Sequence, residues 1–391
     1  MVKTGLDRIV ESFPSELKNK KIGVLCHAPS ITRGYAHIID LLAESKNCTL
    51  SAVFGPQHGL FGQTQDNMIE WEGERHPLYG IPVYSLYGRH RKPTPEMLAG
   101  LEAIVVDVQD AGARLYTYIW TIKLCMEACA EAGIPVWILD RPNPVARLPF
   151  DGPILKPEFF TFVGGASIPL CHRMTTGEMA LWIKKNYHRG CDLTVVEMEG
   201  WHRSSIYTDT RLPWVLPSPN LPTVESALVY PGTVLIEALN LSEGRGTTRP
   251  FELIGAPWIN VSALLKLLRE RKLSGCAFRQ HNYIPTFHKY SGELCQGIQI
   301  HVTDAAVYRP VETALHLLDA IIETSPPGSL SFNPPPYEYE EHLTPFDILS
   351  GDDQMRLTLQ RRLPLDVEIE RWRTETTEFR EEFKKLELYP E

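Results

Sequence analysis

Four short apolar runs, each followed by a polar loop, constrain the fold of this 391-residue chain more than any other feature. A near-continuous apolar run is expected for a parallel strand that is covered on both faces. Segments with helical spacing of apolar residues separate the runs. Strands that alternate with helices predict an α/β fold, a Rossmann-like doubly wound parallel sheet. The runs cover residues 21–26, 50–54, 103–107 and 135–140.

The helix expected between the last two runs has the clearest pattern. Gly133 is placed to end it, and Pro135 lies just beyond. Two cysteines on this helix, four residues apart, could hold a metal, but their position on the apolar stripe favours packing in the core. The apolar residues recur at i, i+3, i+4 and i+7, as Ile122, Cys125, Met126 and Cys129.

Beyond residue 150 this alternation gives way to turn-rich segments. A length of roughly 100–200 residues per domain predicts two or three domains. We place the boundary near the end of a proline-dense stretch at residues 212–222, with a Rossmann-like domain over 1–224 and a second α/β (α+β) domain over 225–391. The last 25 residues have helical spacing. The inner face of that helix would consist of Ile369, Trp372, Phe379 and Phe383.

Composition and absent motifs narrow the function classes. A net charge of −9 argues against a nucleic-acid partner, and no stretch approaches the ~20 apolar residues of a membrane span. The first residues lack the apolar core of a signal peptide, so we expect a cytoplasmic protein. No G-x-G-x-x-G follows the first strand, and no Cys or His pair has metal-ligand spacing, so we expect neither a cofactor nor a metal. The oligomeric state stays open.

Four polar, glycine-containing loops are the candidates for a binding site. In an open α/β sheet, ligands bind outside the carboxyl ends of the strands. Three of the loops follow apolar runs, and the fourth lies in the second half of the chain. We expect all four to converge on one cleft. They cover residues 54–62, 107–114, 140–144 and 242–248.

Several long phrases of the sequence match a known family. They cover residues 84–88, 92–94, 107–114, 116–118, 139–144, 217–220, 230–233, 242–248 and 255–258. On these phrases the chain resembles the exo-β-N-acetylmuramidase (NamZ-type) family of bacterial peptidoglycan-processing glycosidases. The resemblance implies release of N-acetylmuramic acid from the non-reducing end of an amino-sugar glycoside or muropeptide, and a role in cell-wall recycling. It also implies a Rossmann-like domain, a second α/β domain and an active site between them.

One position departs from the family pattern. The loop after the second strand reads Pro-Glu-His-Gly in the family, and its glutamate is the leading catalytic candidate, whereas this chain has Gln57. An amide cannot act as a general acid or base at ordinary pH. Two alternative functions follow: a sugar-binding or sensing protein that kept the cleft, and a hydrolase for another small anionic ligand.

Glycoside hydrolysis normally needs two carboxyl groups, so other acids must be considered. Glu70 lies on a segment, residues 66–72, that could fold back over the cleft, and Glu243 lies in a glycine-rich loop. His58 could donate a hydrogen bond or tune a neighbouring acid. We therefore predict catalytic roles for Glu70, Glu243 and His58. Attack by the substrate's own 2-acetamido oxygen would reduce the need for a second carboxylate.

The remaining predicted site residues would bind the sugar. An arginine can bind the lactyl carboxylate of muramic acid bidentately, and Arg114 and Arg245 are the candidates. Structural alternatives stay open: an Asp110–Arg114 ion pair, a Glu243–Arg245 ion pair, and loop stapling by Arg141 and Asn143. The full set of predicted sugar-binding residues is Gln57, Asp110, Arg114, Tyr116, Arg141, Asn143, Arg245 and Thr247.

Overall fold

The computed structural model describes residues 1–65 and 69–391. Its largest element is a seven-stranded sheet with the order β3-β4-β2-β1-β5-β6-β9. All neighbouring strands pair in parallel except β3, which pairs antiparallel with β4. The predicted doubly wound α/β fold is therefore confirmed. The strands are β1 (Lys21–Cys26), β2 (Thr49–Gly55), β3 (Glu74–Arg75), β4 (Pro82–Ser85), β5 (Ala103–Asp107), β6 (Val136–Leu139) and β9 (Leu193–Val196).

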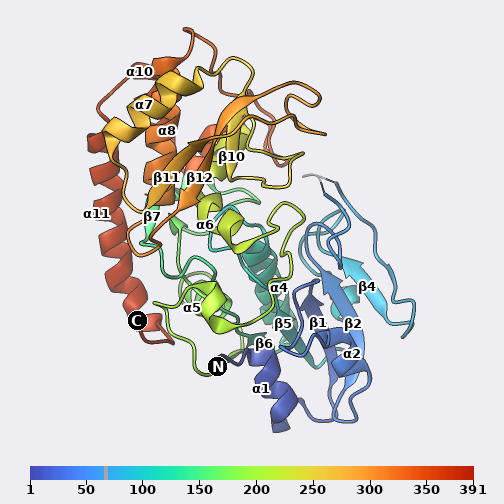
Figure 1. Cartoon of the computed structure of the whole chain (residues 1–391). Helices are drawn as coiled ribbons and strands as arrows, with labels where there is room; N and C mark the ends of the chain where they lie inside the picture. The colour runs from blue at the N-terminus through green and yellow to red at the C-terminus, as the bar shows by residue number, and fades with distance from the viewer. Residues whose placement is uncertain (66–68) are drawn as a thin grey trace.

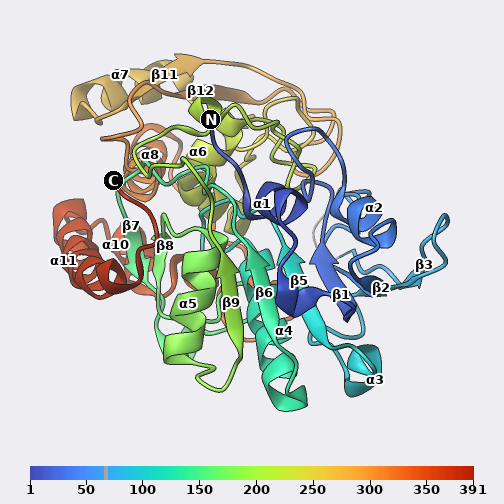
Figure 2. The ribbon, with the colours of Figure 1, turned by 90° about the horizontal axis from the view of Figure 1, so that it is seen from below.

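Helices cover both faces of this sheet. Figure 2 shows α1 and α2 on one face and α3, α4 and α5 on the other. The predicted α4 ends as expected at Gly133, whose φ of 66° is left-handed. Cys125 and Cys129 lie on the face of α4 that is buried in the core. The helices are α1 (Gly5–Glu11), α2 (Ile38–Ala43), α3 (Pro95–Leu98), α4 (Tyr118–Ala132) and α5 (Thr176–Asn186).

The rest of the chain forms a smaller antiparallel sheet with its own helices, at the other end of the molecule (Figure 1). This sheet has the order β10-β12-β11, and a two-stranded sheet of β7 and β8 lies apart from it. The strands are β7 (Asp151–Ile154), β8 (Pro169–Cys171), β10 (Leu253–Ala256), β11 (Cys276–Gln280) and β12 (Gln296–Val302). The helices are α6 (Val224–Thr233), α7 (Val261–Arg271), α8 (Pro310–Thr324), α9 (Pro345–Ser350), α10 (Gln354–Arg361) and α11 (Leu365–Phe383).

Short 3₁₀ helices complete the elements. The one that matters for the site, η4, continues directly from the end of α6. They are η1 (Ser15–Leu17), η2 (Pro157–Phe159), η3 (Tyr207–Thr210), η4 (Val234–Ala238) and η5 (Lys384–Leu386). Within the part of the chain that the structure describes, no helix is long and apolar enough to cross a membrane.

The last long helix, α11, joins the two halves of the molecule. Its predicted inner face is confirmed, because Ile369, Trp372, Phe379 and Phe383 are all buried. The Phe379 ring lies 4.7 Å from that of Trp182 in α5, between ring centroids. One apolar cluster runs without a break from the large sheet to α8 and α11. The boundary at residue 224 stays a prediction.

Candidate active site

One pocket lies where the loops after β2 and β5 meet segments from the second half of the chain. Its lining includes Gln57 and His58 from the first loop and residues 115–118 from the second. Residues of α6, η4 and the glycine-rich loop after η4 form the opposite wall, together with Tyr337 and Glu338. The pocket is narrow, with a volume of about 40 Å³. Two of the four predicted loops, those at 54–62 and 242–248, reach it directly.

The loop after β2 is held in place by hydrogen bonds from the pocket wall. The hydroxyl of Thr117 donates to Oε1 of Gln57 at 2.6 Å. The hydroxyl of Tyr118 lies 3.1 Å from the carbonyl oxygen of Gln57 and 2.8 Å from that of Pro217. His58 has a left-handed φ of 70°, which is uncommon for a residue with a side chain. The loop therefore presents Gln57 and His58 to the pocket in a fixed conformation.

Two carboxyl groups line this pocket, Glu237 from η4 and Glu338 from the segment before α9. Glu237 accepts a hydrogen bond at 2.6 Å from Nη2 of Arg245 and another at 2.7 Å from the hydroxyl of Tyr337. A charged donor and a phenol thus occupy its two carboxylate oxygens.

Glu338 has the opposite surroundings. It is buried, and its Oε2 accepts a hydrogen bond at 3.1 Å from the hydroxyl of Tyr87. Burial, and after it the negative charge of Glu237, raise the pKa of Glu338 to about 7. Tyr87, Arg245 and Arg91 act against this shift. Two carboxyl groups with such different environments are typical of an acid and its ionised partner.

Known proteins that are similar to this chain match it over nearly its whole length. The family described as "Exo-beta-N-acetylmuramidase NamZ" matches with its N-terminal part over residues 22–225 and with its C-terminal part over residues 228–389. The peptidoglycan beta-N-acetylmuramidase NamZ of Bacillus subtilis (strain 168) is 42% identical over 99% of this chain and 91% of that protein. The chain belongs to the NamZ family.

Solved structures agree with this assignment. A DUF1343 family protein from Bacteroides fragilis NCTC 9343 has a TM-score of 0.88 and 31% identity, with 99% of each chain covered. A second DUF1343 protein from the same organism has a TM-score of 0.76 and 29% identity, covering 100% of this chain and 99% of its own. The arrangement of the large sheet and the antiparallel part is thus shared by crystal structures of related proteins.

Sequence reasoning on this NamZ family member missed Glu237 and Glu338. Glu237 lies in a short apolar helix, and Glu338 follows a proline-rich connection. The one signal near Glu338 is the alternation of tyrosine and glutamate at residues 337–340. Its partner Tyr87 lies 251 residues away along the chain. No local spacing could therefore have predicted the pairing.

Of the predicted acids, Glu243 is fully buried behind the pocket and does not line it. Nζ of Lys289 lies 3.0 Å, Nδ1 of His288 3.2 Å and Nε of Arg245 3.7 Å from its carboxylate. Burial alone would raise the pKa of Glu243, but these cations outweigh it and hold the pKa well below its ordinary value. These contacts match the alternative in which Glu243 and Arg245 form a structural pair.

Glu70 lies outside the pocket lining and is exposed. Its Oε1 accepts a hydrogen bond at 3.2 Å from the hydroxyl of Tyr339, the residue after Glu338. Residues 66–68 of the same segment lie outside the described residues. The predicted fold-back of this segment is therefore seen at Glu70, but a catalytic role for Glu70 stays a prediction.

Arg114 does not reach the pocket. It is fully buried, and its two Nη atoms donate to four backbone carbonyl groups, those of Pro153, Ile168, Leu349 and Ser350. Asp110 instead accepts from the backbone of Gly112 at 2.8 Å and lies 3.3 Å from Nε2 of His172. These contacts replace the ion pair expected between Asp110 and Arg114.

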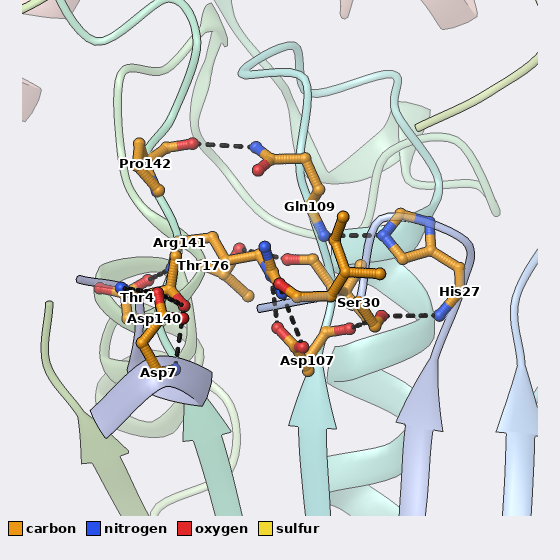
Figure 3. Close-up of polar contacts among 12 residues, drawn as sticks. Thr4, Asp7, His27, Ser30, Asp107, Gln109, Asp140, Arg141, Pro142 and Thr176 are labelled. Carbon is orange, nitrogen blue, oxygen red and sulfur yellow. Dashed lines mark hydrogen bonds and ion pairs between the residues drawn. The ribbon is translucent and has the colours of Figure 1, made fainter. Parts of the chain in front are cut away.

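Arg141 holds loops together at the carboxyl end of the large sheet (Figure 3), and Asn143 joins two loops as well. Nη2 of Arg141 donates to Asp107 at 2.8 Å and to the carbonyl of Ile31, also at 2.8 Å. Asn143 donates to the carbonyl of Met174 at 2.7 Å. These contacts match the stapling alternative, and neither residue lines the pocket.

Two other predicted sugar-binding residues differ in position. Tyr116 lines the pocket, and its ring lies 4.6 Å from that of Tyr118. Thr247 bonds within its own loop, donating to the carbonyl of Gly244 at 2.5 Å. The structure therefore gathers Gln57, His58, Tyr116 and Arg245 in one pocket. Within the described residues no group of three or more His, Cys, Asp or Glu side chains is arranged to hold a metal ion.

Proposed function

We propose that this protein is an exo-acting β-N-acetylmuramidase that removes terminal N-acetylmuramic acid from soluble peptidoglycan fragments. Membership of the NamZ family supports this proposal, as does the relative from Bacillus subtilis that is named for the same activity. The observation that carries it is one pocket with a carboxyl group of raised pKa, Glu338, beside an ion-paired carboxylate, Glu237. Glycosidases use two carboxyl groups in these two protonation states.

In the proposed reaction Glu338 is the general acid. It protonates the glycosidic oxygen while the bond to the leaving sugar breaks. Glu237 is held by hydrogen bonds from Arg245 and Tyr337, and its carboxylate stabilises the positive charge that develops at the anomeric carbon. The oxygen of the substrate's 2-acetamido group attacks that carbon as the glycosidic bond breaks. Water then opens the resulting oxazoline ring and returns a proton to the Glu338 carboxylate, so no second protein nucleophile is required.

Gln57 takes no part in proton transfer in this scheme. Its amide oxygen accepts from Thr117, and its amide NH₂ group is a donor for a sugar hydroxyl. The acid that the family carries at this position is replaced by the Glu237 and Glu338 pair on the opposite wall of the pocket. His58, the residue after Gln57, also lines the pocket, and its imidazole ring helps to position the sugar.

Arg91 lies beside the pocket rather than in its lining, and it is our candidate for the lactyl carboxylate of muramic acid, because Arg245 is already engaged by Glu237. The guanidinium carbon of Arg91 lies 3.7 Å from the centroid of the Tyr339 ring and 5.0 Å from that of Phe162. Its charge acts on Glu338. Within the described residues Arg91 has no ion-pair partner, and its Nε has no hydrogen-bond partner. Stacking fixes the guanidinium plane and leaves its edge for bidentate binding of a carboxylate.

Turnover of a chromogenic β-N-acetylmuramide tests the catalytic pair. Glu338→Gln and Glu237→Gln should each lower kcat by ~10²–10⁴-fold, the contribution of a positioned acid or base. Glu341→Gln, at an exposed position close by in the sequence, is the matched control and should leave kcat unchanged. A wild-type protein without turnover of any β-N-acetylmuramide contradicts the proposed function.

Binding of two free sugars tests Arg91. Arg91→Gln should weaken N-acetylmuramic acid by ~10-fold, because a charge-assisted bidentate contact is worth more than one kcal/mol. Binding of N-acetylglucosamine, which lacks the lactyl carboxylate, should not change. The control is Arg89→Gln, an exposed arginine two residues away. An equal loss of affinity for both sugars would rule out carboxylate recognition by Arg91.

A second candidate function rests on Gln57. An amide at the family's acid position favours a sugar-binding or sensing protein that kept the pocket. Calorimetric binding of N-acetylmuramic acid without turnover, and a gain of turnover in Gln57→Glu, would support it. The cytoplasmic location and the role in cell-wall recycling stay predictions, which fractionation of cells and the analysis of accumulated muropeptides would check.

A further inference from the structure

A second cavity, which shares no lining residue with the candidate active site, is lined by arginines. It has a volume of about 610 Å³ and lies between the residues before β7, the start of α8 and the outer face of α11. The chain as a whole carries a net charge of −9. The positive charge concentrated here therefore opposes the charge of the molecule. The arginines are Arg147, Arg173, Arg309, Arg373 and Arg380.

Within the described residues, two exposed or half-buried carboxylates reach four of these five guanidinium groups, and each is shared by two of them. Glu312 accepts from Nη2 of Arg373 at 2.8 Å and lies 3.9 Å from Nε of Arg309. Glu391 lies 3.2 Å from Arg173 and 3.8 Å from Arg380. Beneath them, buried Asp151 accepts from the first backbone N–H groups of α8.

Arg147 has no carboxylate partner within the described residues and donates to the carbonyl of Ser204. Nε of Arg373 is buried without a hydrogen-bond partner. Positive charge thus exceeds negative charge among the groups that face the cavity, and the N–H donor at Nε of Arg373 is unused. A site of this kind attracts an anion from solution.

Arg173 gives the cavity a fixed wall. It is 8% exposed, its Nε donates to the carbonyl of Ala146 at 2.6 Å, and its guanidinium lies 5.4 Å from the centre of the Phe150 ring. Burial lowers the pKa of Arg173, and the neighbouring guanidinium groups of Arg203 and Arg380 lower it further against the opposing effect of Glu391. A bound anion would relieve this repulsion.

We propose that this arginine-lined cavity binds a small ligand that carries two or more phosphate charges. Guanidinium groups present paired N–H donors that match phosphate oxygens, and five of them surround the space from four segments of the chain. The ligand would take Arg147 and Arg380 as new partners and compete with Glu391 for Arg173. This site does not depend on the proposed glycosidase activity.

Calorimetric titration of the full chain with pyrophosphate tests the proposal. The double variant Arg147→Gln, Arg380→Gln should weaken binding by ~100-fold, about tenfold for each lost charge-assisted contact. The double variant Arg269→Gln, Arg361→Gln removes the same charge from exposed positions elsewhere and should bind like the wild type. Glu338→Gln should also bind like the wild type, which separates this site from the active site.

Three results would overturn the proposal. The first is no binding of pyrophosphate at about millimolar concentration, which is the weak limit for a specific small ligand. The second is an equal loss of pyrophosphate affinity in both double variants. The third is tighter binding of citrate than of pyrophosphate. The thermal unfolding midpoint of each variant without ligand shows whether it is folded. If the Arg147 and Arg380 variant is unfolded, Arg380→Gln alone takes its place, because Arg380 is exposed and has only a distant ionic contact to Glu391.

Discussion

The carboxyl group of Glu338 accepts a hydrogen bond from Tyr87 and lies under the influence of the charge on Glu237. These two neighbours act in opposite directions. A hydrogen bond to the charged form favours ionisation, whereas a nearby like charge opposes it. Burial is the largest influence, and together with these neighbours it leaves the pKa of Glu338 at about 7. Small changes around Glu338 should therefore be visible in the pH dependence of the reaction.

Tyr87→Phe should move the alkaline limb of the pH profile to higher pH. Glu338 is active when protonated, so kcat/KM falls as pH rises through its pKa of about 7. Loss of the Tyr87 hydroxyl removes a donor to the carboxylate, which disfavours ionisation and raises the pKa. The ring itself keeps its packing against Phe162, 5.7 Å away. The measurement is kcat/KM on a β-N-acetylmuramide from about pH 5 to 9, a range that brackets the Glu338 pKa of about 7.

Tyr79→Phe is the control, because the Tyr79 hydroxyl bonds Asp40 and Glu44 at the surface and has no contact with the pocket. Its pH profile should match that of the wild type. An alkaline limb that stays in place in Tyr87→Phe, or moves to lower pH, would mean that Glu338 is not the acid.

Single residues also show where sequence reasoning succeeds and where it stops. Gln57 and His58 were predicted at the site because a polar loop at the end of a parallel strand lies at the sheet's binding edge. The character of Glu338 depends on burial and on Tyr87 and Glu237, which come from distant parts of the chain. Such a property exists only in the folded protein, and no spacing in the sequence encodes it.

At the scale of elements, the loop after β5 was predicted to bind substrate, but its arginine serves the fold. Arg114 joins this loop to β7, to the residue just before β8 and to the end of α9 through four carbonyl groups. Burial lowers the pKa of Arg114 to about 9. Gly351 allows this approach, because a Cβ there would lie 2.7 Å from Nη2 of Arg114.

Arg114→Lys should destabilise the protein and leave the site chemistry intact. A lysine ammonium cannot reach all four carbonyls, and unsatisfied buried acceptors cost about 1–3 kcal/mol each. We expect a loss of at least ~3 kcal/mol in the free energy of unfolding, measured in urea. KM for a β-N-acetylmuramide should stay unchanged at a temperature where the variant is folded. A raised KM with unchanged stability would instead support the predicted role in binding.

The same elements show why the strands were easier to predict than the loops between them. Each predicted apolar run corresponds to a strand of the large sheet within two residues, because a buried parallel strand must be apolar on both faces. A charged loop residue has no such constraint. From the sequence alone, an arginine that binds a carboxylate of the protein, as Arg141 binds Asp107, cannot be distinguished from an arginine that binds a ligand.

At the scale of the whole molecule, the sequence suggested two domains with a cleft between them. The structure adds that the last helix of the second half packs against the first half. The aromatic face of α11 packs on Phe150 and Trp182, with ring centroids 5.5 Å and 4.7 Å from that of Phe379. Both partners precede residue 224, so the apolar surface of the first half is completed by the last helix.

We therefore expect the chain to unfold in one cooperative transition. A fragment that ends at residue 224 would expose the apolar residues that α11 covers, and should lack fixed tertiary packing. Phe379→Ala should lower the stability of both halves together, by about 3–5 kcal/mol, the usual cost of deleting a buried phenylalanine. Calorimetry, tryptophan fluorescence and near-UV circular dichroism should give the same midpoint.

The control is Val367→Ala, at the exposed start of the same helix with 71% of its surface accessible, which should leave the midpoint unchanged. Two separate transitions, of which Phe379→Ala shifts only the second, would contradict a shared core. In that case the two halves would be independent domains, and the pocket between them could open and close as they move. With one shared core, Gln57 on one wall and Glu237 and Glu338 on the other stay at fixed separation, which suits a site where proton transfer requires constant geometry.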